Sequence, residues 1–94
     1  MTTPGGPAFD IPAQVLYREV DGQMVLLDLS SEQYFGLDEV GADIVTRITR
    51  RPFDEALSSL TADYEVEPAT LQRDVDELVD SLLGAGLLER VPPA

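Results

Sequence analysis

Carboxylates are almost the only side chains in this 94-residue sequence that could do chemistry. The chain holds 18 Asp and Glu residues but no His and no Cys, so the usual proton shuttle, thiolate nucleophile and soft metal ligands are missing. Asp74 and Asp76 suggest a divalent metal, yet residues two apart on a helix diverge by about 200° and share an ion poorly. The other acidic residues are scattered rather than paired beside an apolar site that could shift a pKa. We expect no catalysis, metal or cofactor.

Two further motifs have both a functional and a structural interpretation. Arg47, Arg50 and Arg51 could bind phosphate, but they crowd the predicted last turn of a helix, where cations complement the helix dipole. Asp80-Ser81-Leu82 matches the tripeptide that carries phosphopantetheine in acyl carrier proteins. Carrier proteins place that serine at the start of a helix, with two more helices following, whereas Ser81 falls inside a long predicted helix near the end of the sequence. The structural interpretation is favoured for both.

The composition narrows the partners that this chain can have. Its six basic residues against 18 acidic ones give a net charge of −12, which repels nucleic acid and suits a basic or apolar peptide. No apolar run approaches the roughly 20 residues of a membrane span. The first residues, MTTPGGPAF, carry no export signal, so a cytoplasmic location is expected. A chain this short predicts one small domain with a groove rather than a deep catalytic cleft.

The first half of the chain predicts three antiparallel strands. Residues 14–20 alternate as a strand does, and Asp21-Gly22 is typical of a two-residue type I′ hairpin turn. Residues 23–29 return as a second strand, whose apolar run predicts a central position with both faces covered. The third strand, about residues 33–37, is then an edge. It contains no Lys or Pro to block pairing with another chain.

The second half predicts three helices. Asp38 is the expected N-cap of a helix over residues 39–50, Pro52 opens a short second helix, and residues 67–85 form the longest. Strands followed by helices indicate an α+β fold of winged helix-turn-helix type, with the three-stranded sheet packed on three helices. The would-be recognition helix is acidic, which argues against DNA binding. We expect a domain over 11–90 between flexible tails, 1–10 and 91–94.

The third helix and the edge strand together suggest a binding site. An apolar stripe runs along the helix at Leu71, Val75, Leu78 and Leu82, and Val79 and Leu83 widen it to one side. These two residues either line a groove beside the open strand or complete the core against Leu87 and Leu88. Such a groove fits a peptide added to the sheet as an extra strand. The alternative is a scaffold or regulatory subunit that uses the same edge to dimerise.

The stretch VLLDLSSEQYFGLDEVGADIV, residues 25–45, resembles the PqqD-like family of peptide-recognition elements. It is similar to that family's strand, turn, Tyr-Phe strand and Leu-Asn-x-x-Gly helix start. A later pattern agrees with it, at Val75, Leu78, Gly86, Leu87 and Leu88. The resemblance covers about residues 15–90. Asp38 stands where the family often has Asn, which also caps helices, and Val45 stands where Trp is frequent.

The resemblance implies a non-catalytic module that binds the leader segment of a ribosomally made precursor as a fourth antiparallel strand. The strand contacts it implies are backbone groups of Glu32, Gln33, Tyr34, Phe35 and Gly36. The helix contacts would be among Val75, Asp76, Val79 and Leu83, with Asp74 if the peptide lies on the opposite flank. The chain looks most like the leader-binding half of a lasso-peptide protease, whose partners would be a transglutaminase-like cysteine protease and a macrocyclase. A PqqD-type chaperone of pyrroloquinoline quinone biosynthesis is the alternative within the family.

Overall fold

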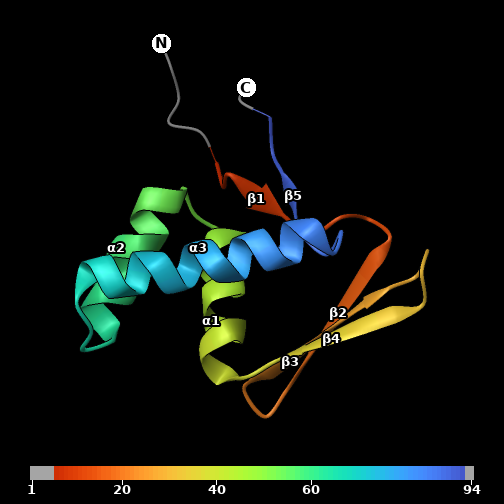
Figure 1. Cartoon of the computed structure of the whole chain (residues 1–94), viewed down its shortest axis with the longest axis horizontal. Coiled ribbons are helices and arrows are strands. Elements are labelled where there is room, and N and C mark those ends of the chain that lie inside the picture. Colours follow the sequence, from red (N-terminus) through yellow and green to blue (C-terminus); the bar gives the residue numbers. More distant parts are fainter. Residues whose placement is uncertain (1–5, 93–94) are drawn as a thin grey trace.

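A three-stranded antiparallel sheet from the first half of the chain packs on three helices from the second half (Figure 1). The computed structural model describes residues 6–92. The strands of this sheet are β2 (Val15–Val20), β3 (Gln23–Asp28) and β4 (Gln33–Leu37), in the spatial order β2-β3-β4. The helices are α1 (Glu39–Ile48), α2 (Phe53–Asp63) and α3 (Pro68–Gly84). The predicted α+β architecture is confirmed, with β3 in the centre.

Local sequence signals set the strand and helix boundaries. Asp21 and Gly22 adopt φ values of 52° and 82°, as a type I′ turn requires. The carboxylate of Asp38 accepts a hydrogen bond from the Gly41 N–H at 2.8 Å and so caps α1. The helix ends at Ile48, two residues before the predicted Arg50. Gly86, at φ 75°, turns the chain out of α3.

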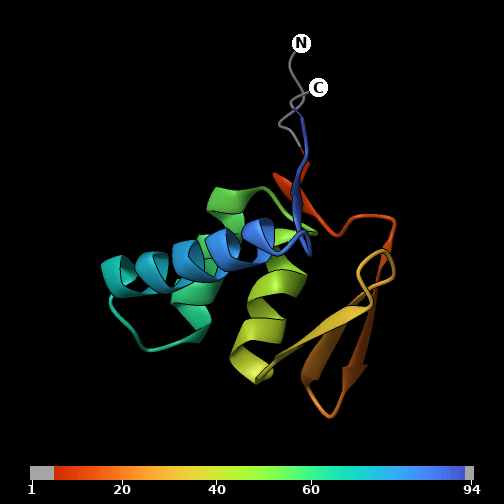
Figure 2. The same cartoon turned by 45° about the vertical axis from the view of Figure 1, so that its right-hand side comes forward.

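A second, two-stranded sheet joins the two ends of the domain. β1 (Phe9–Asp10) pairs antiparallel with β5 (Glu89–Arg90), and the two lie side by side in Figures 1 and 2. Phe9 is only 6% exposed, and its ring meets that of Phe53 edge to face at 5.5 Å. The ordered domain therefore starts before residue 11, where the sequence predicted it to begin. The flexibility predicted for residues 1–5 and 93–94 lies outside the described residues.

The core fills the space between the inner face of the sheet and the helices. Residues from every helix and from both sheets contribute to it. Leu87 and Leu88, which follow α3, are buried in it as well. Its fully buried large side chains are Leu26, Val45, Ile48, Leu60, Val75 and Leu82. Val40, in the first turn of α1, is exposed.

The outer face of the sheet is not covered within the described residues. Val25 in the central strand is 41% exposed, and its outer-face neighbours Leu16, Val20 and Tyr34 are exposed as well. The prediction that both faces of β3 are covered is therefore wrong. The apolar run of β3 packs on its inner side only, and its other side meets solvent.

Candidate functional site

The β4 strand lies at an edge of the sheet, and its five residues match the predicted third strand. Within residues 6–92 it pairs with β3 on one side only, from Asp28 with Gln33 to Met24 with Leu37. The strand QYFGL contains no Lys or Pro, and its pairing with β3 runs without a bulge. Within the described residues it therefore lacks the Lys, Pro and bulge that often protect a sheet edge from a further strand.

Hydrogen bonds between antiparallel strands alternate, so only every second residue of β4 turns its backbone groups outward. The N–H of Leu29 donates to the carbonyl of Gln14 at 2.9 Å, which fixes the alternation between β2 and β3. Because Leu29 bonds to β2, every second residue before it in β3 turns its backbone groups the other way, toward β4. These residues are Met24, Leu26 and Asp28. Their partners in β4 are Gln33, Phe35 and Leu37.

In the part of the chain that the structure describes, the backbone groups of Tyr34 and Gly36 are consequently those left free at this edge. Two of the residues named from sequence, Gln33 and Phe35, use their backbone groups inside the sheet by this count. Glu32 lies in the preceding turn at φ 59°, where its N–H donates to the carbonyl of Asp28 at 2.8 Å. Sequence reasoning gave the strand but not this alternation, because a single strand carries no signal for the side on which its partner lies.

The side chains of β4 divide between the two faces of the sheet. Tyr34 pairs with Leu27 on the outer face and is 76% exposed. Phe35 pairs with Leu26 on the inner face and is 39% exposed, because it stands at the rim of the core. A strand added to β4 would thus meet an aromatic side chain on each face.

The helix residues named from sequence do not all lie on one side of α3. Val75 is fully buried and Val79 is 4% exposed, so both belong to the core, while Leu83 is partly buried against it. Asp76 and Val79 line a hollow together with Phe9, Phe53 and Arg90. Asp74 is exposed.

The position of this hollow identifies which flank of α3 faces β1 and β5 and which faces β4. It lies on the flank of α3 that faces β1 and β5, whereas β4 lies on the other side of the helix (Figures 1 and 2). At about 100° per residue, Asp74 and Leu78 project to the flank opposite Asp76 and Val79. Of the acidic pair, only Asp74 is therefore on the side of β4. The interpretation of Val79 as a side chain surplus to the core is wrong, because Val79 completes the core.

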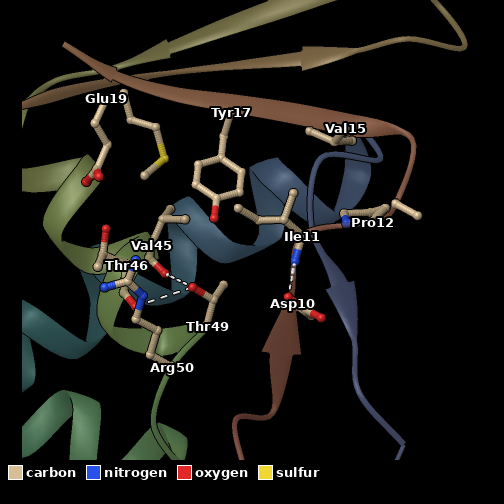
Figure 3. Close-up of a pocket in the computed structure, with 12 residues that line it drawn as sticks. Asp10, Ile11, Pro12, Val15, Tyr17, Glu19, Val45, Thr46, Thr49 and Arg50 are labelled. Carbon is tan, nitrogen blue, oxygen red and sulfur yellow. Dashed lines mark hydrogen bonds between the residues drawn. The ribbon is translucent and has the colours of Figure 1, made fainter.

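The opposite edge of the sheet, β2, borders a cavity of about 280 Å³ (Figure 3). Tyr17 and Glu19 extend into it from β2, facing Thr46 of α1 and the two residues Thr49 and Arg50 that follow this helix. The hydroxyl of Thr49 is already engaged, because it donates to the carbonyl of Val45 at 2.7 Å. The sequence did not indicate this second open edge as a feature of interest.

A polar cluster ties α1 to the end of α2. The guanidinium of Arg47 donates to Asp43 at 2.8 and 3.1 Å, to Asp63 at 2.6 Å and to the Ser59 hydroxyl at 3.0 Å. The hydroxyl of Tyr64 donates to Asp43 at 2.7 Å. Arg47 is thereby engaged within the fold, in keeping with a structural rather than a phosphate-binding interpretation.

The cluster also shifts the pKa of its members. Burial acts to raise the pKa of Asp43, but the hydrogen bonds from Arg47 and Tyr64 outweigh it and bring that pKa below its ordinary value of 3.8. The hydrogen bond to Asp43 raises the pKa of both Arg47 and Tyr64. All three groups keep their ordinary charge at neutral pH, which suits an architectural ion pair rather than an acid–base pair.

No helix within residues 6–92 combines the length and apolar character needed to cross a membrane. The same residues contain no group of three or more carboxylates placed to hold a metal ion.

This chain is similar to one protein family and to two solved structures. The family described as coenzyme PQQ synthesis protein D (PqqD) matches residues 23–88. The solved structure "TbiB1 in Complex with the TbiA(beta) Leader Peptide" is 33% identical, with a TM-score of 0.79, and covers 88% of this chain and 98% of that chain. The structure "Lasso peptide synthetase B1 complexed with the leader peptide" is 32% identical, with a TM-score of 0.74, and covers 90% and 99%. No curated protein matches the chain.

Proposed function

Because this chain belongs to the PqqD family, we propose that it captures the leader segment of a ribosomally made precursor peptide as a fourth strand on β4. The observation that carries the proposal is the unprotected edge of β4, where the backbone groups of Tyr34 and Gly36 are free to pair. Strand addition supplies affinity through backbone bonds and leaves side-chain contacts to set specificity. The two similar structures, both solved with a leader peptide, support this assignment.

The helix contact in this proposal comes from the flank of α3 that carries Asp74 and Leu78. This flank lies on the side of β4, whereas Asp76 and Val79 lie toward Phe9 and Phe53. Inward-facing side chains of the bound strand would meet Phe35 at the rim of the core. The net charge of −12 favours a peptide with basic or neutral residues and speeds its encounter more than it tightens the complex.

The bound precursor would then be presented to separate maturation enzymes, while this chain itself is not catalytic and acts in the cytoplasm. A lasso-peptide pathway is favoured, since both similar structures are leader-peptide complexes at over 30% identity and one of them is a lasso peptide synthetase B1. The partners would be a transglutaminase-like cysteine protease and a macrocyclase. The family description supports a second candidate function, a PqqD-type role in quinone cofactor synthesis.

Tyr34 offers a sharp test of strand addition. Its N–H points to the open edge, so Tyr34→Pro removes a peptide-facing donor without removing a bond to β3. Tyr34→Ala is the matched control, because it removes the same side chain and keeps the donor. Calorimetric titration should show Tyr34→Pro binding about tenfold more weakly than Tyr34→Ala, the cost of one unmade backbone bond.

The titration uses the TbiA(beta) leader peptide and the leader of a quinone-cofactor precursor. Binding of one and not the other assigns the pathway. Equal affinities for Tyr34→Pro and Tyr34→Ala, with both variants folded by circular dichroism, would reject pairing at this edge.

A further inference from the structure

The second open edge of the sheet, β2, is as unprotected as β4. Its strand VLYREV contains no Lys or Pro, and its pairing with β3 runs without a bulge. The alternation of hydrogen bonds between β2 and β3 leaves the backbone groups of Tyr17 and Glu19 free at this edge within residues 6–92. The N–H of Val15, next in line, already donates to the carbonyl of Pro12 at 2.9 Å.

The side chains of these same two edge residues line the cavity of about 280 Å³ beside β2 (Figure 3). Their cross-strand partners, Leu26 and Met24, are buried, so Tyr17 and Glu19 lie on the inner face of the sheet. Met24 and Val45 give the cavity an apolar lining. The residues of an added strand that pair with Tyr17 and Glu19 would project onto the same face, into the cavity.

The polar groups around this cavity are mostly hydrogen-bond acceptors. Glu19 and Asp10 place exposed carboxylates on opposite sides of it (Figure 3). The hydroxyls of Thr46 and Thr49 each donate to the carbonyl four residues earlier, at 2.8 and 2.7 Å, so only their lone pairs remain. Arg50 is the one cation in the lining. Among the described residues, none of these three charged groups forms an ion pair.

We propose that β2 and this cavity form a second docking site, for an extended segment of a partner protein that carries Lys or Arg over the cavity. The segment adds as a strand to the free backbone groups of Tyr17 and Glu19. The apolar stem of the basic residue packs on Met24 and Val45, and its charged head bonds to the carboxylate of Glu19. Two carboxylates against one guanidinium make the lining net negative, which favours a cation.

The partner is a different protein rather than a second copy of this chain. Two copies would each carry a net charge of −12 and repel one another. The edge strands of a second copy also lack a suitable basic residue. β4 contains none, and the only one in β2, Arg18, pairs with the exposed Val25 on the outer face, away from the cavity.

The site on β2 can be filled while a leader peptide occupies β4, because β3 lies between the two edges. Strands added to both edges would be four strand spacings apart, about 19 Å. Such an arrangement suits a maturation enzyme, which has to contact this chain while the precursor is held. This choice of partner rests on the proposed function and deepens it.

The first test is selection from a displayed library of random 12-residue peptides on Tyr34→Pro, in which the edge of β4 is blocked. Tyr17→Pro, added to this protein, removes an outward-facing donor and no bond to β3, and Tyr17→Ala is the matched control. Peptides that bind the Ala variant about tenfold more tightly than the Pro variant use the β2 edge. They should share a Lys or Arg at one fixed position. Circular dichroism checks that both variants fold.

The second test concerns the charge of that shared residue. Its replacement by Met, which keeps an apolar stem, should weaken calorimetric binding about fivefold to the wild type and less than twofold to Glu19→Gln. Glu77→Gln is the control, since it removes the same charge from an exposed position of α3 outside the cavity. It should behave as the wild type does.

The third test asks whether the two edges bind independently. Saturating wild-type protein with the TbiA(beta) leader peptide should change its affinity for a selected peptide less than twofold. Competition between the two would show that they use one edge, and would overturn the second site.

The outcomes separate this proposal from the proposed function. If no selected peptide depends on the edge donor of Tyr17, or if the dependent ones share no basic residue, the docking site on β2 is rejected, whatever the leader titration shows. If peptides bind β2 as expected and no leader pairs with β4, the proposed function fails alone, and the choice of a maturation enzyme falls with it.

Discussion

The carboxylate of Asp43 joins two helices through hydrogen bonds from both. Arg47 on the next turn of α1 and Tyr64 at the end of α2 donate to its oxygens, and Arg47 reaches on to Asp63. Because Asp43 is only partly accessible whereas Asp63 is well exposed, the two ion pairs of Arg47 should differ in strength.

Asp43→Asn should destabilise the protein by about 1 kcal/mol at pH 7, since it removes the charge on which both donors act. Asp63→Asn should cost less, as expected for an exposed pair. The folded-state pKa of Asp43 lies below its ordinary value, so its stabilising effect is present above that value and is lost as pH falls through the lowered pKa. Urea unfolding of wild type and Asp43→Asn from pH 7 down to pH 2.5 should show their difference shrink below about pH 4. A constant difference would contradict the assignment.

Single residues also show what the sequence could reveal. The turn at Asp21-Gly22 and the cap at Asp38 were predicted because each is encoded by the residues that form it. The ion pair between Arg47 and Asp63 was not, since it joins residues sixteen apart. Gly36 was quoted from sequence only as a backbone contact, because its empty surroundings appear only in three dimensions.

At the scale of elements, the sequence determines the position of β4 more fully than it determines the orientation of α3. The bounds of β4 match the prediction, since a short aromatic run ends at a helix cap. The apolar stripe of α3 identifies the side that faces the core, but not which flank lies beside β4. The pairing of β1 with β5 was missed because strands of two residues have no periodicity to detect and their partners are distant.

The two flanks of α3 can be tested with one pair of variants. Asp74→Arg should weaken binding of a leader peptide by about fivefold at low salt, whereas Asp76→Arg should leave it unchanged, because only Asp74 lies on the side of β4. Calorimetry in 20 mM and 500 mM NaCl should show the Asp74→Arg effect fade with added salt. A larger effect of Asp76→Arg would place the peptide on the flank next to Phe9 and Phe53.

At the scale of the whole molecule, the sheet has two open edges and the chain has a large negative charge. β2 and β4 both lack a partner strand on one side within the described residues, and edges of this kind pair with one another when nothing prevents it. The net charge of −12 opposes such self-pairing at neutral pH. Near the sequence isoelectric point of about 4.1 the net charge is close to zero, so this electrostatic repulsion between molecules disappears.

We therefore expect a monomer at pH 7 that associates as pH approaches 4, measured by light scattering after size exclusion. Tyr17→Lys combined with Tyr34→Lys should suppress association, because edge lysines block pairing. Val66→Lys with Val91→Lys adds the same charge at exposed sites off both edges and should suppress it less. If the wild type is already a dimer at pH 7 and the edge lysines dissociate it, the result would instead support a scaffold that dimerises through its sheet edge.

The pairing of β1 with β5 has a consequence for how this domain can be connected to others. Phe9 and Arg90 are neighbours, so the chain enters and leaves the domain at one place, on the side of α3 away from β4 (Figures 1 and 2). A domain with adjoining ends can be fused at either end, or inserted into a loop of a host enzyme, without stretching its own backbone. Such a graft would leave the edge of β4 unobstructed. With a precursor bound there as proposed, the host would receive it already held at a fixed distance from its active site.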